Sequence, residues 1–365
     1  MYVCPWPLKK PTFEAKDYPK SEFGFYTMCR DGVDIFSYAP KRNGIVKKIW
    51  KMCPSVFAPL FTQIGCLKHQ DKCDIIYIGF DMHLMPLAIM KMVGLCHKPV
   101  FVLSHFTYNY HYTKIWWKKI YKKIERWFVT RYIDRLSFAN DVLLKVAVQG
   151  GALNKKHWNV ANWGAVTEFY DRNIYKEKPT SDFFMAAGGM NRDYATLIEA
   201  FRHCPNAKLK IFAKYKDYTK GINIPSNVEF ENLMVNNDFI GAYKQLRDKY
   251  YNCKAILLPI NYINDVPNGA TVLVEALAMG KPIIITQADT NYIDVEREGC
   301  GMTIKPHDVE DWIRVITYLI NNPNEVERMG KRSYQLAKEK YNDRNFVNTI
   351  LQQMVELVNQ KNNYC

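Results

Sequence analysis

The sequence of 365 residues lacks long apolar runs and closely spaced cysteines. No stretch approaches the ~18–20 apolar residues that a membrane-spanning helix needs. The ten cysteines are scattered and never form a Cys-x-x-Cys pair, a spacing that argues against a zinc site. Because the first residues form no apolar signal segment, we expect reduced thiols and a cytoplasmic protein. An Asp-x-Asp pair is also absent, so no metal ion is implied.

Acidic residues are scarce in the first half of the chain. Residues 1–172 hold 26 Lys and Arg against 13 Asp and Glu, a net charge of +13. Residues 173–365 hold 24 against 23, a net charge of +1. Such an asymmetry favours an anionic partner, which is a membrane, a nucleic acid or a phosphorylated substrate.

The segment 114–131 concentrates this positive charge, and its only acid is Glu125. On a predicted helix its lysines share one face, while aromatic and aliphatic residues supply an apolar surface. The lysines are Lys118, Lys119, Lys122 and Lys123, and the apolar residues are Trp116, Trp117, Ile120, Ile124, Trp127 and Phe128. Tryptophan prefers the bilayer interface, and lysines pair with anionic lipid head groups. We therefore predict that segment 114–131 binds an anionic membrane surface.

Two alternatives apply to this helix. Its apolar side can pack on the core, with the lysines solvated. Nucleic-acid binding is the other, but no recognised nucleic-acid motif accompanies the patch, and we expect no nucleic acid as a partner.

Apolar runs alternate with helical patterns along the chain, and this βαβ rhythm predicts parallel sheets. The expected strands cover residues 73–79, 99–105, 134–138, 158–160, 183–187, 208–213, 228–230, 255–259 and 283–285. The expected helices cover residues 84–93, 114–135, 194–201, 309–321, 326–341 and 343–359. A polar, proline-bearing segment at 171–180 fits an interdomain linker. We expect two α/β domains, residues 1–172 and 180–340.

The stretch 268–286 holds the most informative pattern. Asn268 and Gly269 indicate a turn, and a helical pattern begins at Thr271. Gly280 ends this helix in a left-handed conformation, and a short apolar strand follows.

Glu275 lies one turn into this helix, beside apolar neighbours. Burying a carboxylate without a partner is costly, so we expect a hydroxyl or amide partner. Backbone N–H groups at the helix start favour an anion. Together these groups suit a nucleotide, with phosphate on the amides and ribose hydroxyls on Glu275. The Thr271 hydroxyl is a candidate for a phosphate contact or for the helix cap.

This segment resembles the donor-binding signature of GT-B glycosyltransferases, especially the retaining family 4. The matching run is Glu275-Ala276-Leu277-Ala278-Met279-Gly280-Lys281-Pro282. The family pattern has another glutamate upstream, and Pro267 stands at that position. The resemblance implies a GT-B fold, in which two Rossmann-like parallel-sheet domains face a cleft. It also implies that Glu275 holds the ribose and that the C-terminal helix, residues 343–365, returns to the first domain.

The turn after strand 183–187 is a second candidate for donor binding. Gly188 and Gly189 let backbone amides approach a ligand, and Arg192 can pair with a diphosphate through two hydrogen bonds. In the family resembled, basic residues of this turn hold the donor diphosphate, although Gly189 stands where the first arginine is expected. Lys214 is the candidate for a second positive charge. The alternative is a plain turn with a solvated arginine.

His105 ends a predicted strand, at the sheet edge where α/β folds bind ligands. The resemblance implies a place near the donor sugar and the leaving phosphate, where the ring could bind a sugar hydroxyl. The alternative is a structural histidine. The catalytic candidates are His105 and Arg192. The donor-binding candidates are Gly188, Gly189, Arg192, Lys214, Asn268, Gly269, Ala270, Thr271 and Glu275.

We therefore expect a glycosyltransferase that moves a hexosyl or related sugar from a nucleotide-sugar donor, with retention of configuration. The expected acceptor is lipid-linked or a cell-envelope polysaccharide, met at the cytoplasmic face of the membrane, to which the protein binds peripherally. No metal ion or other cofactor is expected, because positive side chains and helix-start amides can stabilise the leaving diphosphate. The alternatives are another GT-B enzyme, a nucleotide-sugar epimerase or phosphorylase, and a non-catalytic nucleotide-sugar-binding protein with a decayed donor site.

Overall fold

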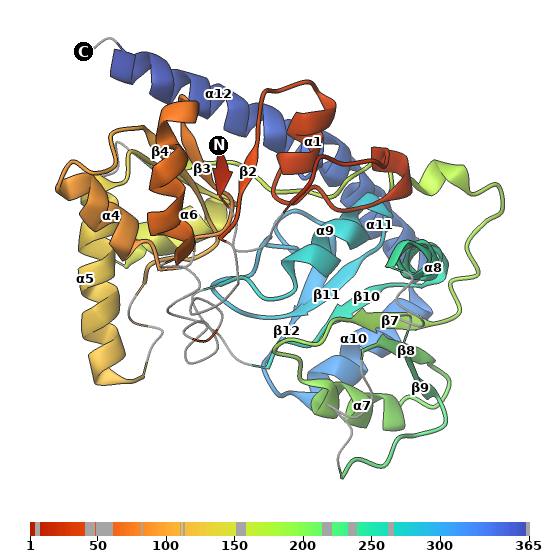
Figure 1. Cartoon of the computed structure of the whole chain (residues 1–365). Coiled ribbons are helices and arrows are strands. Elements are labelled where there is room, and N and C mark those ends of the chain that lie inside the picture. The colour runs from red at the N-terminus through yellow and green to blue at the C-terminus, as the bar shows by residue number, and fades with distance from the viewer. Residues whose placement is uncertain are drawn as a thin grey trace.

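The computed structural model describes residues 1–3, 8–40, 48, 61–81, 83–109, 111, 114–150, 158–213, 221–232, 239–261 and 266–362. It contains two α/β domains, each built on a six-stranded sheet (Figure 1). Neighbouring strands are parallel in both sheets. The predicted fold class is confirmed.

The first sheet has the strand order β2-β1-β3-β4-β5-β6. Its strands are β1 (Tyr2–Val3), β2 (Ser37–Tyr38), β3 (Ile76–Ile78), β4 (Val100–Ser104), β5 (Arg135–Phe138) and β6 (Trp158–Val160). The helices of this domain whose bounds are described are α1 (Phe25–Arg30), α4 (Met85–Met92), α5 (Trp116–Tyr132) and α6 (Asp141–Gln149), with the short 3-10 helices η1 (Ala15–Asp17) and η2 (Leu67–Lys72). The strands β3 and β4 are buried along their whole length, as parallel strands are when helices cover both faces of a sheet.

The second sheet has the order β12-β11-β10-β7-β8-β9. Its strands are β7 (Phe184–Ala187), β8 (Leu209–Phe212), β9 (Val228–Glu231), β10 (Ile256–Leu258), β11 (Ile283–Thr286) and β12 (Gly301–Ile304). Its helices are α7 (Tyr194–Arg202), α8 (Phe239–Asn252), α9 (Ala270–Ala278), α10 (Val309–Asn321) and α11 (Pro323–Glu339), and η5 (Arg172–Ile174) precedes them. Chain order reverses between β7 and β10, which makes the loops after these two strands the expected ligand-binding edge.

Every expected strand and helix is present, with small differences at the ends. Among the described α-helices and strands, the sequence pattern did not predict β1, β2, β12, α1, α6 or α8. The strands β1 and β2 have two residues each, too few to show a period. The strand β12 begins at Gly301, where a Cβ would lie 1.8 Å from the carbonyl oxygen of Ile283, so glycine is required inside this strand.

The helix α12 (Asp343–Asn362) returns to the first domain, as the resemblance implies. Figure 1 shows it running along that domain beside α1. Its apolar side belongs to the same hydrophobic cluster as β3, β4 and β5, through Phe346, Val347, Ile350, Met354 and Leu357. The Gln353 side chain also donates to the carbonyl of Val160 at 2.9 Å.

The chain crosses between the domains twice, and the two crossings lie side by side. The Ala165 N–H donates to the Tyr341 carbonyl at 3.1 Å, and the Asp343 N–H donates to the Ala165 carbonyl at 2.9 Å. Gly164 is required at this contact, because a Cβ would lie 2.0 Å from the carbonyl carbon of Tyr341.

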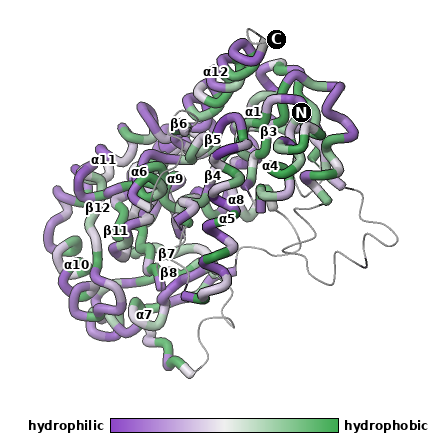
Figure 2. Tube along the Cα trace, turned by 90° about the vertical axis from the view of Figure 1, so that its left-hand side faces the viewer, coloured by the Kyte–Doolittle hydropathy of each residue, from purple (hydrophilic) through white to green (hydrophobic). Residues whose placement is uncertain are grey.

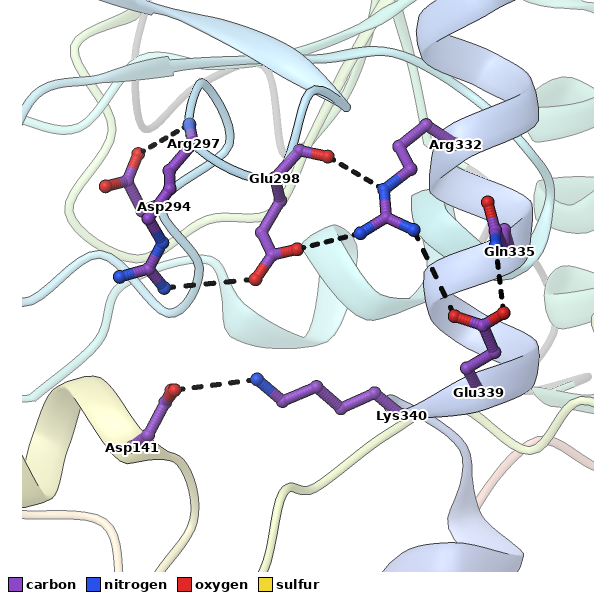
Figure 3. A network of polar contacts seen from close by, with 8 residues as sticks. All are labelled: Asp141, Asp294, Arg297, Glu298, Arg332, Gln335, Glu339 and Lys340. Atoms are coloured by element: carbon purple, nitrogen blue, oxygen red, sulfur yellow. Dashed lines mark hydrogen bonds and ion pairs between the residues drawn. The ribbon is translucent and has the colours of Figure 1, made fainter.

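Side chains of the second domain also bind the first. The buried Tyr292 hydroxyl lies 2.7 Å from the Ala139 carbonyl oxygen and 2.6 Å from that of Trp163. Figure 3 shows an ion pair of 3.5 Å between Lys340, after α11, and Asp141, at the start of α6. Partly exposed ion pairs of this kind contribute about 0–1 kcal/mol each, so the tyrosine contact is the firmer link.

Candidate functional site

The loop after β7 and the loop after β10 are joined at the point where strand order reverses. Arg192 pairs with Ile260 in an isolated antiparallel bridge. The Asp193 N–H donates to the Pro259 carbonyl at 2.9 Å, and the Asn261 N–H donates to the Asn191 carbonyl at 3.2 Å. Open α/β sheets bind ligands at such a reversal, at the carboxyl ends of their strands.

The Arg192 guanidinium lies between two glycines. It is 8% exposed, and it donates from Nε to the Ala187 carbonyl at 3.3 Å and from Nη1 to the Met190 carbonyl at 2.9 Å. A Cβ on Gly188 would lie 3.0 Å from Nη2, and a Cβ on Gly269 would lie 3.2 Å from it. Both glycines have a positive φ, 97° and 79°, a conformation that other residues adopt at a cost. The two glycines therefore make the space that the arginine fills.

This arrangement places a positive charge at the start of α9. Gly269 is the N-cap of α9, and no side chain caps this helix. Helix-start N–H groups and an arginine fork together suit a phosphate group. The cap alternative for Thr271 is wrong, since Thr271 lies inside the first turn, where it is exposed.

Glu275 lies in the second turn of α9 and is 7% exposed. Its Oε1 accepts a hydrogen bond from the Tyr170 hydroxyl at 2.7 Å, and its Oε2 accepts one from the Tyr250 hydroxyl at 2.8 Å. Burial raises the pKa of Glu275 to about 7, while the two tyrosine hydrogen bonds oppose that rise. The protein itself thus supplies hydroxyl partners for this acid. A carboxylate offers about four lone-pair positions, so a ribose would share Glu275 with the two tyrosines.

His105 follows β4 at the carboxyl edge of the first sheet. Its Nε2 lies 3.2 Å from the Gly79 carbonyl oxygen. Its ring packs on Phe23 at 4.7 Å and on Phe80 at 5.3 Å between centroids. Burial lowers the pKa of His105 to about 4, so the ring is neutral near pH 7. With Nε2 donating to Gly79, Nδ1 is an acceptor that suits a hydroxyl group.

The structure therefore groups most of the predicted donor-binding residues. Those at the reversal point of the second sheet are Gly188, Gly189, Arg192, Asn268, Gly269, Ala270 and Thr271. Glu275 lies in the second turn of α9, and His105 belongs to the first domain. Lys214 lies outside the described residues. Sequence reasoning missed Tyr170 and Tyr250, because no pattern connects them to a glutamate so far along the chain.

The helix α5 is the other predicted surface. Its apolar stripe faces solvent, since Trp116, Trp117, Ile120, Ile124 and Trp127 are all exposed, Trp116 at 72%. Hydrophilic and hydrophobic residues alternate along this helix in Figure 2. The buried side carries other residues, Arg126, Val129 and Thr130. Packing on the core therefore does not account for the stripe. Within the described ranges, no helix is both long and apolar enough to cross a bilayer.

Residues 170–336 match the family model described as glycosyl transferases group 1. The chain therefore carries a group 1 glycosyltransferase domain. This match begins at Tyr170 and takes in Arg192, Gly269 and Glu275. No curated protein sequence matches the chain.

Solved structures share the two-domain fold over about nine tenths of the chain. HepE of Anabaena, in complex with UDP-glucose, is 13% identical, with a TM-score of 0.65 over 91% of this chain and 89% of HepE. Sucrose-phosphate synthase of Thermosynechococcus elongatus is 12% identical, with a TM-score of 0.63 over 90% and 84%. A trehalose-phosphate synthase of Burkholderia vietnamiensis is 11% identical, with a TM-score of 0.63 over 93% and 81%. The resemblance to GT-B glycosyltransferases is confirmed.

Proposed function

We propose that this glycosyltransferase works at the cytoplasmic face of a membrane. It moves a sugar from a nucleotide-sugar, with retention of configuration, to a lipid-linked or cell-envelope polysaccharide acceptor. The exposed apolar stripe of α5 carries this proposal, because it gives the first domain a surface that suits lipid.

The stripe is continuous along the helix. Trp116, Ile120, Ile124 and Trp127 follow one another at spacings of four, four and three residues, which places them on one side. All four side chains are exposed, so they can reach a planar surface at once. Tryptophan and isoleucine on an exposed helix face are typical of helices that lie in a bilayer interface.

Basic residues border this stripe. Lys119 and Lys123 are each three residues beyond a stripe residue and therefore lie beside it. The Lys118 ammonium lies 5.4 Å from the Trp117 ring, and the Arg131 guanidinium lies 5.6 Å from the Trp127 ring. Anionic lipid head groups would bind these cations while the rings enter the interface, and each lysine near such a surface contributes about 1 kcal/mol. The net charge of +13 over residues 1–172 adds long-range attraction.

The donor site follows from the second domain. Arg192 and the start of α9 would hold the diphosphate, with Glu275 beneath them for the ribose. HepE is solved with UDP-glucose, so UDP-sugars are the first donors to test. Retention follows from the resemblance to family 4, and proton NMR of the anomeric linkage in the product tests it directly.

Vesicle flotation tests the membrane part of the proposal. The variant replaces Lys118, Lys119, Lys122 and Lys123 with Gln. The matched control replaces four exposed lysines of the second domain with Gln, namely Lys208, Lys305, Lys331 and Lys338. On vesicles that contain phosphatidylglycerol, the α5 variant should lose up to about 4 kcal/mol of binding free energy, at about 1 kcal/mol per lysine. The control should bind as the parent does. Equal losses in both variants would mean that net charge alone drives binding and that α5 has no special role.

A non-catalytic nucleotide-sugar-binding protein is the second candidate. Both oxygens of Glu275 are bonded to tyrosines, and Pro267 stands where the family pattern has an acid. Donor binding by calorimetry, without turnover on any membrane acceptor, would favour this candidate over the transferase.

A further inference from the structure

Asp81 is a buried acid at the carboxyl edge of the first sheet, next to His105. It follows β3 and is 2% exposed. Its Oδ1 accepts the backbone N–H of His105 at 2.8 Å. Its Oδ2 accepts hydrogen bonds from the Ser104 hydroxyl at 2.6 Å and from the Tyr108 hydroxyl at 2.7 Å. Three donors from the end of β4 and the loop after it thus converge on one carboxylate.

Residues that follow β3 contact both the backbone and the ring of His105. Its backbone N–H binds Asp81, while its ring Nε2 lies 3.2 Å from the Gly79 carbonyl oxygen. The rings of Phe23 and Phe80 pack on the imidazole. These contacts fix both the place of the His105 backbone and the orientation of its ring.

The same carboxylate connects His105 to α5. Tyr108 has a φ of 52°, a left-handed conformation that costs about 1–2 kcal/mol for a residue with a side chain. Its hydroxyl is bound to Asp81, and its carbonyl accepts from Arg126 Nη1 at 3.2 Å. The buried Arg126 also donates to the carbonyls of Gly150 at 2.8 Å and Ala147 at 2.9 Å. The loop from His105 to Tyr108 is therefore hydrogen-bonded to Asp81 on one side and to Arg126 of α5 on the other.

A carboxylate at this depth is costly, and packing alone does not call for one. The groups that face Asp81 are the hydroxyls of Ser104 and Tyr108 and the backbone N–H of His105. From α5, Arg126 donates to the carbonyl of Tyr108. Burial, then Asp81 and then the charge of Glu125 raise the pKa of the Tyr108 hydroxyl. Burial outweighs the three hydrogen bonds and raises the pKa of Asp81 to about 7. This costly burial of a carboxylate occurs next to His105, the predicted catalytic residue of the first domain.

We propose that Asp81 is a positioning residue for sugar transfer. Through the His105 N–H and the Tyr108 hydroxyl it holds the imidazole where Nδ1 accepts a hydrogen bond from a hydroxyl of the transferred sugar. This inference rests on the proposed function of the site.

The test compares Asp81→Asn with Asp74→Asn, an exposed acid before the other end of the same strand. An asparagine has one acceptor oxygen and cannot accept all three hydrogen bonds. We expect kcat to fall about tenfold to a hundredfold in Asp81→Asn, as for a displaced catalytic group. The KM for the donor should stay within about twofold, since the loss affects the transition state more than donor binding. The Asp74→Asn variant should show neither change.

NMR of protein labelled at histidine reads the position of His105 without any activity. The His105→Ala variant assigns the signal, and Asp81→Asn should shift it, whereas Asp74→Asn should not. The Tyr108→Phe variant removes one donor of the three and should give a smaller shift and a smaller fall in kcat. If Asp81→Asn does not fold, the Tyr108→Phe variant takes its place in both measurements.

The two readouts separate the possible failures. An unmoved His105 signal in both network variants would overturn the inference, and so would a moved signal with unchanged kcat. Absence of transfer by the parent protein would contradict the proposed function, yet the NMR comparison would still decide whether Asp81 positions His105.

Discussion

The Tyr170 hydroxyl donates to the Glu275 carboxylate at 2.7 Å, across 105 residues of sequence. Tyr170 lies at the junction of the two domains, and Tyr250 of α8 binds the other carboxylate oxygen at 2.8 Å. The acid proposed to hold the ribose is therefore part of a buried network that includes the interdomain segment. A ribose at this site would share Glu275 with two protein hydroxyls.

The Glu275→Gln variant should bind UDP or a UDP-sugar more weakly than the parent. A hydrogen bond to a charged group is worth about 1.5–3 kcal/mol, so the dissociation constant should rise about tenfold or more. The Gln side chain keeps the shape and can still bind both tyrosines, which preserves the fold. Isothermal calorimetry measures the affinity, with Glu310→Gln, an exposed glutamate of α10, as the control. Unchanged affinity in Glu275→Gln would remove Glu275 from the donor site.

The Gly269→Ala variant should lose turnover because its methyl group enters the space of Arg192. The Gly221→Ala variant is a matched control, since both glycines have a φ of 79° and no atom of the described residues lies within 4 Å of a Cβ at Gly221. Both variants should lose about 1 kcal/mol of stability from the left-handed backbone. Only Gly269→Ala should also lower kcat on a UDP-sugar. Equal kinetics in the two variants would show that the close packing of Arg192 on Gly269 plays no part in transfer.

Stability should depend on pH through Glu275. Burial raises its pKa to about 7 in the folded protein from 4.5, so the folded state binds more protons than the unfolded state between these values. The free energy of unfolding should therefore fall as pH rises through this window and level off above it. Glu275→Gln should remove a part on the order of 3 kcal/mol. Urea unfolding at about pH 5 and pH 8 measures the change, and parallel curves for variant and parent would refute this source of pH dependence.

The tryptophans of α5 should act on membrane binding without supporting the fold. Replacing Trp116 and Trp117 with Ser should weaken vesicle binding even at about 1 M salt, where lysine contributions are screened. The melting temperature should stay near that of the parent, because both rings are exposed. Trp312→Ser is the contrast, since Trp312 is 1% exposed and a large truncation in a core costs about 3–5 kcal/mol. Unfolding of the Trp116 and Trp117 variant would favour the core-packing alternative.

Sugar transfer should survive removal of divalent metal ions. Arg192 and the N–H groups at the start of α9 would stabilise the leaving diphosphate, so EDTA should leave the initial rate unchanged. Arg192→Gln should instead lower kcat about a hundredfold, the usual scale for losing one group that stabilises a developing charge. Rates with and without EDTA, for parent and variant, make the comparison. Complete inhibition by EDTA would show that a metal ion is needed.

Local chemistry explains which elements could be predicted. The predicted bounds of α10, residues 309–321, agree with the structure, in which the Asp308 side chain caps the first turn and the buried residues recur at helical spacing. The end of α9 followed from Gly280, which has a φ of 65°. The strands β1 and β2 could not be predicted, since their pairing depends on residues far away in sequence, as in the contact of Tyr2 with Tyr77.

The sequence predicted which chemical groups the site residues need, but not which residues supply those groups. Sequence reasoning required a hydroxyl or amide for Glu275, and the structure provides Tyr170 and Tyr250. It identified Arg192 as a candidate, while the packing of Arg192 between Gly188 and Gly269 depends on how the loops after β7 and β10 meet. Asp81 carried no local signal, because its partners come from the next strand and loop of the fold.

Transfer of labelled sugar into lipid tests the central claim most directly. Each UDP-sugar of a labelled panel is incubated with the protein and with anionic vesicles that carry membrane lipid extract, and the organic phase is then counted. We expect one donor to give lipid-linked label together with free UDP, and Arg192→Gln to lower the rate at which both form about a hundredfold. Label that stays in the aqueous phase as unchanged donor, isomerised donor or sugar phosphate would contradict the account.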